Sequence, residues 1–291
     1  MTMDKEIRAL INLLDDPDNI VYKAVSEKIT EKGLEAIPSL EKAWETSVDQ
    51  EIQQKIEDLI QFIQFRYISN EIRIWAKDKE NGILYGAYLI ARYQYPDLYF
   101  SEIEEHIELL RKDVWLEIND NLTAMEKVRI MNHILFVKHK FNRNSSNFYS
   151  PRNSFINQVL ESKRGNPISL SVIYASVAEK LGFPIAGVNL PLNYILAWKD
   201  PFYEDDPNGV LFYINPYRRG AILSKKDIEH FLKQQKLDPR PEYFKPCSNL
   251  TTAERILRNL IFSYEKLGYT DKVEEVNKLL RIVQKPDDQT P

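Results

Sequence analysis

The first 66 residues place apolar side chains at three- and four-residue steps, which is the spacing of amphipathic helices. In residues 5–14 the apolar positions are Ile7, Leu10, Ile11 and Leu14. Asp16-Pro17-Asp18 then interrupts the pattern, because proline cannot continue a helix. Gly33 is suited to end a helix in the left-handed conformation. Further helices are predicted over residues 19–31, 34–44 and 50–65.

A second helical block is predicted over residues 69–141. In it, Thr123 and Glu126 have the spacing of a capping box, in which each side chain bonds to the other residue's backbone. A later helix is predicted to begin at Pro167, where the missing N–H costs nothing, and to end before Gly182. Most positions of this later helix are apolar, so we expect it to be buried.

Short runs rich in β-branched and aromatic residues follow this helix. They occupy residues 185–190, 194–198 and 210–214. An acidic turn over residues 204–209 separates the last two runs. We expect a small antiparallel sheet that packs on the preceding helix.

The C-terminal part returns to helical patterns. Ser224 with Asp227 has the spacing of a helix cap. Residues 239–246 form a proline-rich connector, after which Thr251 with Glu254 opens a final helical hairpin. Glycine is scarce, with 9 in 291 residues against a usual share of about 7%. The pattern therefore predicts an α+β fold that is predominantly helical.

Composition narrows the possible functions. The chain has 39 Lys and Arg against 43 Asp and Glu, a net charge of −4, which argues against a nucleic-acid partner. No stretch approaches the roughly 18 uninterrupted apolar residues of a membrane span, and the first residues mix acidic and basic side chains unlike a signal peptide. A single Cys excludes an internal disulfide and suits a reducing compartment. We expect a cytoplasmic protein without a membrane anchor.

Motifs for common cofactors are absent from the sequence. It contains no phosphate-binding loop, no dinucleotide fingerprint and no HExxH. Glu102 and His106 have a helical metal-pair spacing, but two side chains without a third indicate a solvated helix face. We predict neither a cofactor nor a metal.

Two segments resemble helical repeats. The text LLDDPDNIVYKAVSEKITEKGLEAIPSL resembles a HEAT repeat, with Tyr22 where such a unit often has Arg. The text RNLIFSYEKLGYTDKVEEVNKLLRIV resembles a tetratricopeptide unit with Gly268 at its turn. Helical repeats bury their apolar faces against neighbours, so fragments as short as these must dock on the rest of the chain or on another protein.

Residues 81–283 resemble the bacterial SirB family. The matching texts are NGILYGAYLIARYQYPDL, NFYSPRNSFINQVLESKRGNPISLSVIYASVAEKLGFPIAGVNLP and FYINPYRRGAILSKKDI. The resemblance implies a transglutaminase-like (papain-like) core followed by tetratricopeptide-like helices. The expected domains are a HEAT-like segment (residues 1–66), the transglutaminase-like domain (67–238) and a C-terminal helical hairpin (239–291).

The resemblance also implies where a catalytic site would lie. Such a site needs a Cys at the start of a buried helix, a His on the next strand to take its proton, and an Asp to orient that His. Counting back from the end of the helix puts the nucleophile position at or near Pro167, with Ser169 as the nearest hydroxyl. In this sequence Pro-Leu-Asn, ending at Asn193, replaces the Pro-Gly-His of the family. Asn-Pro-Tyr, beginning at Asn215, replaces its Asp-Pro-Phe.

These replacements predict a fold that is kept and a chemistry that is lost. A carboxamide does not titrate near pH 7 and cannot take a proton from a hydroxyl or a thiol. Asn193 and Asn215 could instead hydrogen-bond to each other and preserve the geometry. The prediction is a catalytically degenerate protein that works as a scaffold or interaction module for an unidentified protein partner.

Other interpretations remain open. Ser169 or Ser171 could act as the nucleophile of a hydrolase or acyltransferase, with His230 or Glu161 as the base. Ser169 could equally be a helix-start hydroxyl that bonds to a backbone N–H. The chain could also be a purely structural body that binds nothing. Cys247 is expected to be a partly exposed thiol without a role.

Overall fold

The structure, a computed structural model, describes residues 3–200, 202 and 209–287, with the backbone alone for residues 3–5. The chain forms two compact units, Met1–Glu71 and Ile72–Pro291. Apart from Gly209, the acidic turn expected over residues 204–209 lies outside the described residues.

Short helices connected by tight turns build the N-terminal unit. They are α1 (Met3–Ile11), α2 (Asn19–Glu31), η1 (Gly33–Ala36), α3 (Ile37–Thr46) and the first part of α4 (Gln50–Lys77). Asp18 caps α2, because its carboxylate accepts a hydrogen bond from Ile20 N at 2.8 Å. Gly33 has a φ of +62°, which confirms the left-handed position predicted there. The core of the unit comprises Ile7, Ile11, Leu14, Val25, Ile29, Ala36, Leu40, Ile56, Leu59 and Ile63.

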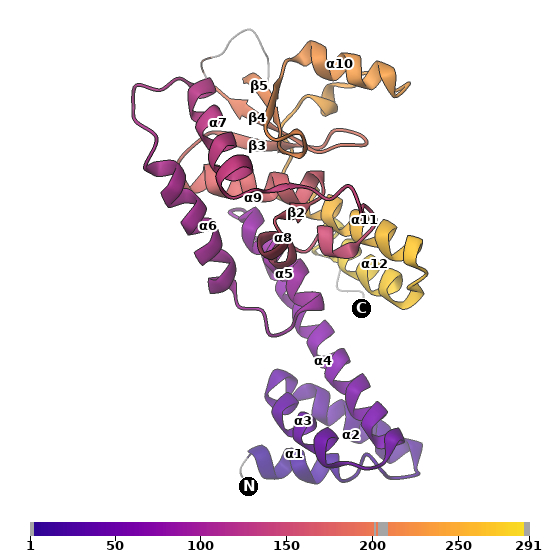
Figure 1. The fold of residues 1–291 in the computed structure, drawn as a ribbon. Coiled ribbons are helices and arrows are strands. Elements are labelled where there is room, and N and C mark those ends of the chain that lie inside the picture. Colours follow the sequence, from indigo (N-terminus) through magenta and orange to yellow (C-terminus); the bar gives the residue numbers. More distant parts are fainter. Residues whose placement is uncertain (1–2, 201, 203–208, 288–291) are drawn as a thin grey trace. The chain divides into compact units, whose positions relative to one another are not determined.

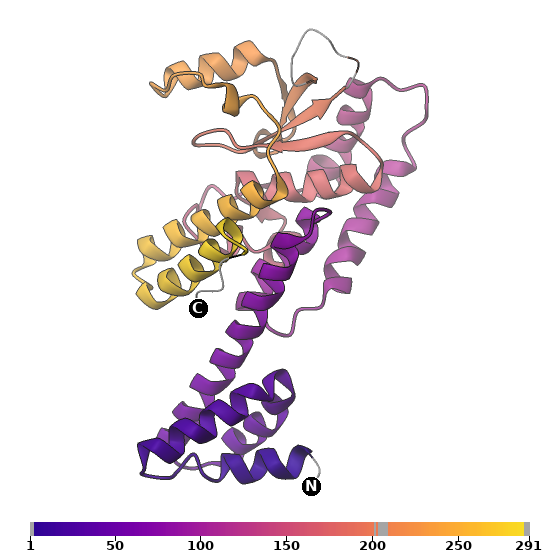
Figure 2. The same ribbon diagram turned by 180° about the vertical axis from the view of Figure 1, so that it is seen from behind.

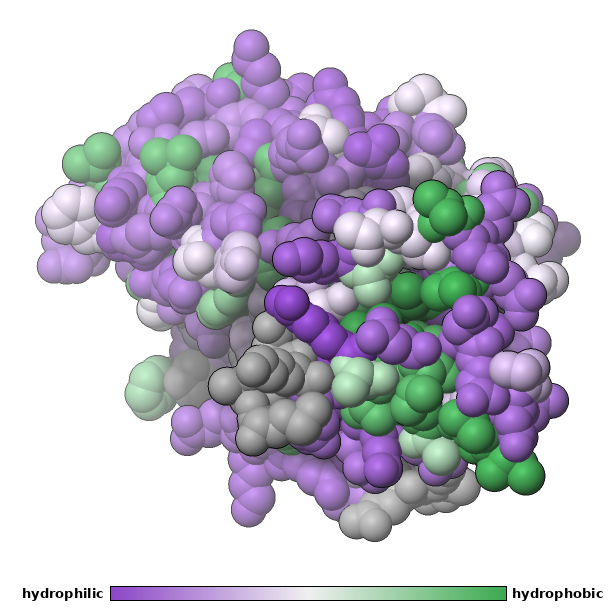
Figure 3. All heavy atoms as spheres, turned by 90° about the horizontal axis from the view of Figure 1, so that it is seen from below, coloured by the Kyte–Doolittle hydropathy of each residue, from purple (hydrophilic) through white to green (hydrophobic). Residues whose placement is uncertain are grey.

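Apolar side chains also reach the surface of this unit. Figure 3 shows them gathered in a patch on the face that the view presents. Ile20 is 78% exposed and Phe62 is 55% exposed. An exposed apolar patch is a place where another surface can bind.

Helix α4 continues to Lys77, well past the end predicted at residue 65. Residues 50–81 contain neither Gly nor Pro, and Gly82 is the first residue that can interrupt the helix. None of the described helices is both long enough and apolar enough to cross a lipid bilayer.

The larger unit packs several of its helices around one of them, α9 (Pro167–Lys180). Its other helices are α5 (Ile83–Gln94), α6 (Phe100–Trp115), α7 (Ala124–Asn132), α8 (Ile156–Ser162), α10 (Lys225–Gln234), α11 (Asn249–Leu267) and α12 (Thr270–Gln284). Shorter turns are the π-helix η2 (His133–Lys138) and the 3₁₀ turns η3 (Pro151–Asn153), η4 (Pro216–Arg218) and η5 (Pro241–Tyr243). Helix α9 contacts α5, α6, α8 and α11 as well as the sheet, which explains why its sequence is apolar nearly all round (Figure 1).

The sheet is antiparallel and has the strand order β3-β4-β5-β6. Its strands are β3 (Ile185–Val188), β4 (Ile195–Lys199), β5 (Val210–Asn215) and β6 (Ala221–Leu223). The three predicted runs form β3 to β5, whereas the three-residue β6 was not predicted. Helix α9 contacts the sheet, and on the sheet the side chains of Ile195 and Tyr213 share a core with Ile228 and Leu232 of α10. The sheet therefore lies between α9 and α10, as seen from both sides in Figures 1 and 2.

Helix ends follow the local signals in most places. The capping boxes at Thr123 and at Ser224 are confirmed, and so is the first-turn position of Pro167. Helix α11 begins earlier than predicted, because Ser248 rather than Thr251 is its N-cap. Helices α11 and α12 pack against each other at the C-terminal end of the described chain.

Candidate functional site

The start of α9 is a closed hydrogen-bonded cap. The Asn166 side chain accepts a hydrogen bond from Ser169 N at 2.9 Å, and Ser169 Oγ accepts one from Asn166 N at 3.0 Å. Asn166 Nδ2 also donates to Ser154 Oγ at 2.9 Å. Ser169 is 2% exposed. Its hydroxyl thus serves the helix start, as the structural interpretation of this residue expects.

The backbone approaches this helix start closely. Strands β1 (Asn142–Arg143) and β2 (Arg164–Gly165) pair in parallel just before α9. A Cβ atom added to Gly165 would lie 2.6 Å from Ser169 Oγ, so only glycine fits there. The backbone of Gly165 therefore lies close to the Ser169 hydroxyl.

Ser171 also bonds to the backbone. Its Oγ donates to Pro167 O at 2.7 Å and lies 3.5 Å from Tyr194 O. The two titratable groups considered as bases for these hydroxyls are both exposed and have other partners. His230 Nε2 lies 2.9 Å from Gln234 Nε2, and Glu161 lies 3.5 Å from Gln158 Nε2.

Asn193 is half-buried in the loop that leads into β4. Its side-chain oxygen accepts a hydrogen bond from Tyr194 N at 2.8 Å, and its own N–H donates to Leu190 O at 3.2 Å. The preceding Leu192 has a φ of +60°, a left-handed conformation that is uncommon for a branched residue. The carboxamide therefore helps to hold a tight turn.

Asn215 ends β5 and is 2% exposed. Its side chain caps η4 by accepting a hydrogen bond from Arg218 N at 3.3 Å. The pairing of Leu196 with Ile214 brings the loop holding Asn193 and the end of β5 to neighbouring strand ends. Among the described residues, however, each carboxamide bonds to local backbone and not to the other one.

The loop of Asn193 is attached to α11 through a charged side chain. Arg255 of α11 donates to Asn189 Oδ1 at 3.0 Å and to Asn193 O at 3.4 Å. Burial lowers the pKa of this guanidinium below its ordinary value. No local sequence pattern predicts this contact, because 62 residues separate Arg255 from Asn193.

Tyr194 makes a second connection to the same helix. Its hydroxyl lies 2.7 Å from Thr252 Oγ1 and 3.5 Å from Cys247 Sγ. Burial, together with the nearby thiol, raises the pKa of Tyr194 well above its ordinary value. Tyr194 is therefore a neutral donor and acceptor. Cys247 is half-buried directly before the N-cap of α11.

The arginines that flank these positions in the sequence bond to the backbone. Arg164 donates to Lys140 O at 3.2 Å and Arg219 donates to Phe136 O at 3.2 Å. They connect segments of the chain and do not converge on Ser169.

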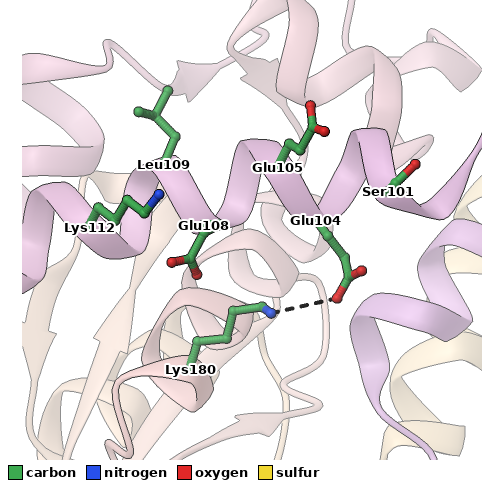
Figure 4. Close-up of a pocket in the computed structure, with 7 residues that line it drawn as sticks. All are labelled: Ser101, Glu104, Glu105, Glu108, Leu109, Lys112 and Lys180. Atoms are coloured by element: carbon green, nitrogen blue, oxygen red, sulfur yellow. Dashed lines mark ion pairs between the residues drawn. The ribbon is translucent and has the colours of Figure 1, made fainter.

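A surface hollow lies at the other end of α9. It has a volume of about 490 Å³ and is formed by α6 side chains together with Lys180, the last residue of α9 (Figure 4). Lys180 Nζ lies 3.7 Å from Glu104 Oε1. Thirteen residues separate Lys180 from Pro167, which is roughly 20 Å along a helix. A second hollow of about 440 Å³ adjoins Gly182, also at that end.

Other titratable groups form structural contacts. The Glu102 carboxylate accepts a hydrogen bond from Tyr99 N and closes the cap of α6, so it has a role apart from His106. Asp113 of α6 contacts His139 Nε2 at 2.6 Å and Lys138 Nζ at 2.9 Å, a cluster that the sequence did not predict. Within the part of the chain that the structure describes, no three His, Cys, Asp or Glu side chains are placed to hold a metal ion.

Comparison with known proteins agrees with this architecture. Residues 101–258 match the family model described as Transglutaminase-like superfamily. A "UPF0162 protein" from Xylella fastidiosa (strain 9a5c) is 30% identical over 217 residues, which cover 71% of this chain and 73% of that protein. A "UPF0162 protein" from Vibrio cholerae is 26% identical over 52% of this chain and 56% of that protein.

A human protein is also similar to about half of this chain. The "F-box only protein 21" from Homo sapiens is 26% identical over 156 residues, which cover 52% of this chain and 23% of that protein. No solved structure matches the chain.

Proposed function

Since the chain belongs to the transglutaminase-like superfamily, we propose that it is a catalytically degenerate member that acts as a protein-interaction or scaffold module. The proposal includes a HEAT-like segment over residues 1–66 and tetratricopeptide-like helices over residues 239–291. It also includes a cytoplasmic location, which the single cysteine favours.

The observation that carries this proposal is the carboxamide of Asn193. It stands at the position that the SirB resemblance gives to the proton-accepting His, and its oxygen is occupied by Tyr194 N at 2.8 Å. A carboxamide does not titrate near pH 7. Ser169 provides the hydroxyl nearest to the nucleophile position. Its backbone N–H and its Oγ both already form hydrogen bonds with Asn166. Neither group is left to start an acyl transfer.

The exposed apolar side chains of the N-terminal unit support a role in binding. Ile20, at 78% exposure, lies on α2, and Phe62, at 55%, lies on α4. Helical repeat segments cover such faces by stacking against a neighbour. A partner protein would supply that neighbour.

An amine-incorporation assay tests the catalytic half of the proposal. The purified chain is incubated with a fluorescent primary amine and a glutamine-bearing protein, and the label transferred per hour is measured. We expect the parent chain and a Ser169→Ala variant to give the same background value. Incorporation by the parent that Ser169→Ala or Ser171→Ala abolishes would overturn the proposal and favour an active acyltransferase.

A further inference from the structure

Arg255 is a half-buried cation that faces neutral acceptors. Its two hydrogen bonds go to the side-chain oxygen of Asn189 and to the backbone oxygen of Asn193. A guanidinium has five N–H donors. Among the residues that the structure describes, two of these donors have an acceptor, which leaves three for something else.

Acidic side chains on the same helix do not neutralise Arg255. Glu254, the adjacent carboxylate, accepts a hydrogen bond from Gln284 at 3.1 Å and lies 3.8 Å from Arg258. The salt bridges found in the described ranges include none to Arg255. A partly buried charge without a counter-ion is unfavourable, and a bound anion would offset that cost.

The groups around Arg255 are held in place before any ligand binds. Thr252, one helical turn earlier on α11, bonds to Tyr194, and Tyr194 N bonds to the Asn193 side chain. The loop and the guanidinium are therefore attached to one helix. Leu192, which is 69% exposed, adds an apolar side chain in the same loop. Preorganised contacts of this kind lower the entropy cost of binding.

We propose that Arg255 and the loop of residues 189–193 recognise the carboxylate of an acidic side chain on a partner peptide, with Leu192 contacting an apolar neighbour of that side chain. A carboxylate matches the planar fork of the guanidinium and brings one negative charge to a cation that has no ion pair within the described part of the chain. A phosphate dianion would leave excess charge in a partly buried place. The inference rests on the proposed function and specifies one of its binding surfaces.

Nuclear magnetic resonance of the arginine Nε–H signals tests this inference on the full chain. The signal of Arg255 is assigned by its loss in Arg255→Lys, and that of Arg258 by its loss in Arg258→Lys. The probe is the capped tripeptide acetyl-Ala-Glu-Leu-amide, and the matched control is acetyl-Ala-Gln-Leu-amide. Sodium chloride and inorganic phosphate at equal ionic strength are the remaining arms.

We expect the Glu peptide to shift the Arg255 signal saturably, with the Arg258 signal unchanged and the Gln peptide inactive. Arg255→Gln should weaken binding of the Glu peptide roughly tenfold to a hundredfold, while Arg258→Gln leaves it unchanged. If Arg255→Gln does not fold, the titration of the parent chain still decides. No saturable shift, or an equal shift with chloride, phosphate or the Gln peptide, would overturn the inference. The amine-incorporation assay does not depend on this result, so the inference can fail while the proposed function stands.

Discussion

Buried hydroxyls on α9 have different surroundings. Ser171 Oγ donates to Pro167 O at 2.7 Å, whereas Ser176 Oγ, on a side chain 1% exposed, has no hydrogen-bond partner among the described residues. A buried polar group without a partner retains its desolvation cost. The same residue type therefore has opposite effects on stability at two positions of one helix.

A matched pair of variants measures this difference. Ser176→Ala should raise the free energy of unfolding by about 1 kcal/mol, because it removes an unpaired hydroxyl and improves helix propensity. Ser171→Ala should lower it by about 1 kcal/mol, because it removes a paired one. Urea unfolding of both variants and the parent gives the values. Equal losses in both variants would show that the hydroxyl of Ser176 is satisfied.

Local residue signals were predictable, and distant contacts were not. Pro167 at the first turn of α9 follows from its fixed φ and missing N–H. Gly33 and Gly268 in left-handed caps follow from the backbone freedom of glycine. The contact of Arg255 with Asn193 depends on how α11 packs against α5 and α9, which no local pattern encodes. The sequence therefore identified Asn193 and missed its cationic neighbour.

At the scale of elements, the start of α9 depends on Asn166. This side chain accepts from Ser169 N and donates to Ser154 Oγ, so it fixes the helix start and the preceding segment together. Asn166→Ala should lower the free energy of unfolding by about 2 kcal/mol, at the upper end for an N-cap. Asn166→Asp keeps the acceptor oxygen, so it should lower the free energy of unfolding by a smaller amount. Thermal unfolding compares the two variants with the parent. An Asn166→Ala variant as stable as the parent would refute the role of the cap.

The contact between α6 and the π-helix gives a pH-dependent stability. The hydrogen bond from Lys138, assisted by His139, lowers the pKa of Asp113 below its ordinary value of 3.8. A lowered folded-state pKa stabilises the fold above the ordinary value, and this stabilisation disappears as the pH falls through the folded-state value. Asp113→Asn should lower the free energy of unfolding by about 1 kcal/mol at pH 5.

Urea unfolding of the parent and Asp113→Asn between pH 5 and pH 2 tests this contact. The difference in free energy of unfolding between the two proteins should disappear as the pH falls below 4, where the carboxylate of the parent becomes protonated. A gap that stays constant down to pH 2 would show that Asp113 contributes no charge-dependent stabilisation.

Element bounds show where sequence patterns stop being informative. The runs that became β3, β4 and β5 were recognised by their β-branched and aromatic residues. The strand β6 has three residues, too few for a period to show, and it is defined by its pairing with β5. Helix α4 extends beyond its predicted end because residues 66–77 contain no Gly or Pro that would interrupt a helix.

At the scale of the whole molecule, the sequence predicted a mainly helical α+β chain with a small antiparallel sheet and a transglutaminase-like domain, and both are confirmed. The structure divides the chain after Glu71, inside α4. The site that we propose to be degenerate draws on three separate segments: the start of α9, the loop before β4 and the end of β5. The strand register brings the last two to neighbouring strand ends, which a linear pattern cannot supply.

Mass spectrometry of the intact protein tests most directly whether this site has lost its chemistry. A Cys247→Ser chain, which removes the only thiol, is incubated with a p-nitrophenyl ester as acyl donor, beside the same chain carrying Ser169→Ala. Our account predicts the same number of acyl adducts on both chains, with no acyl group found on Ser169 by peptide mapping. A stoichiometric acyl adduct on Ser169 that forms with a burst of nitrophenol would contradict it.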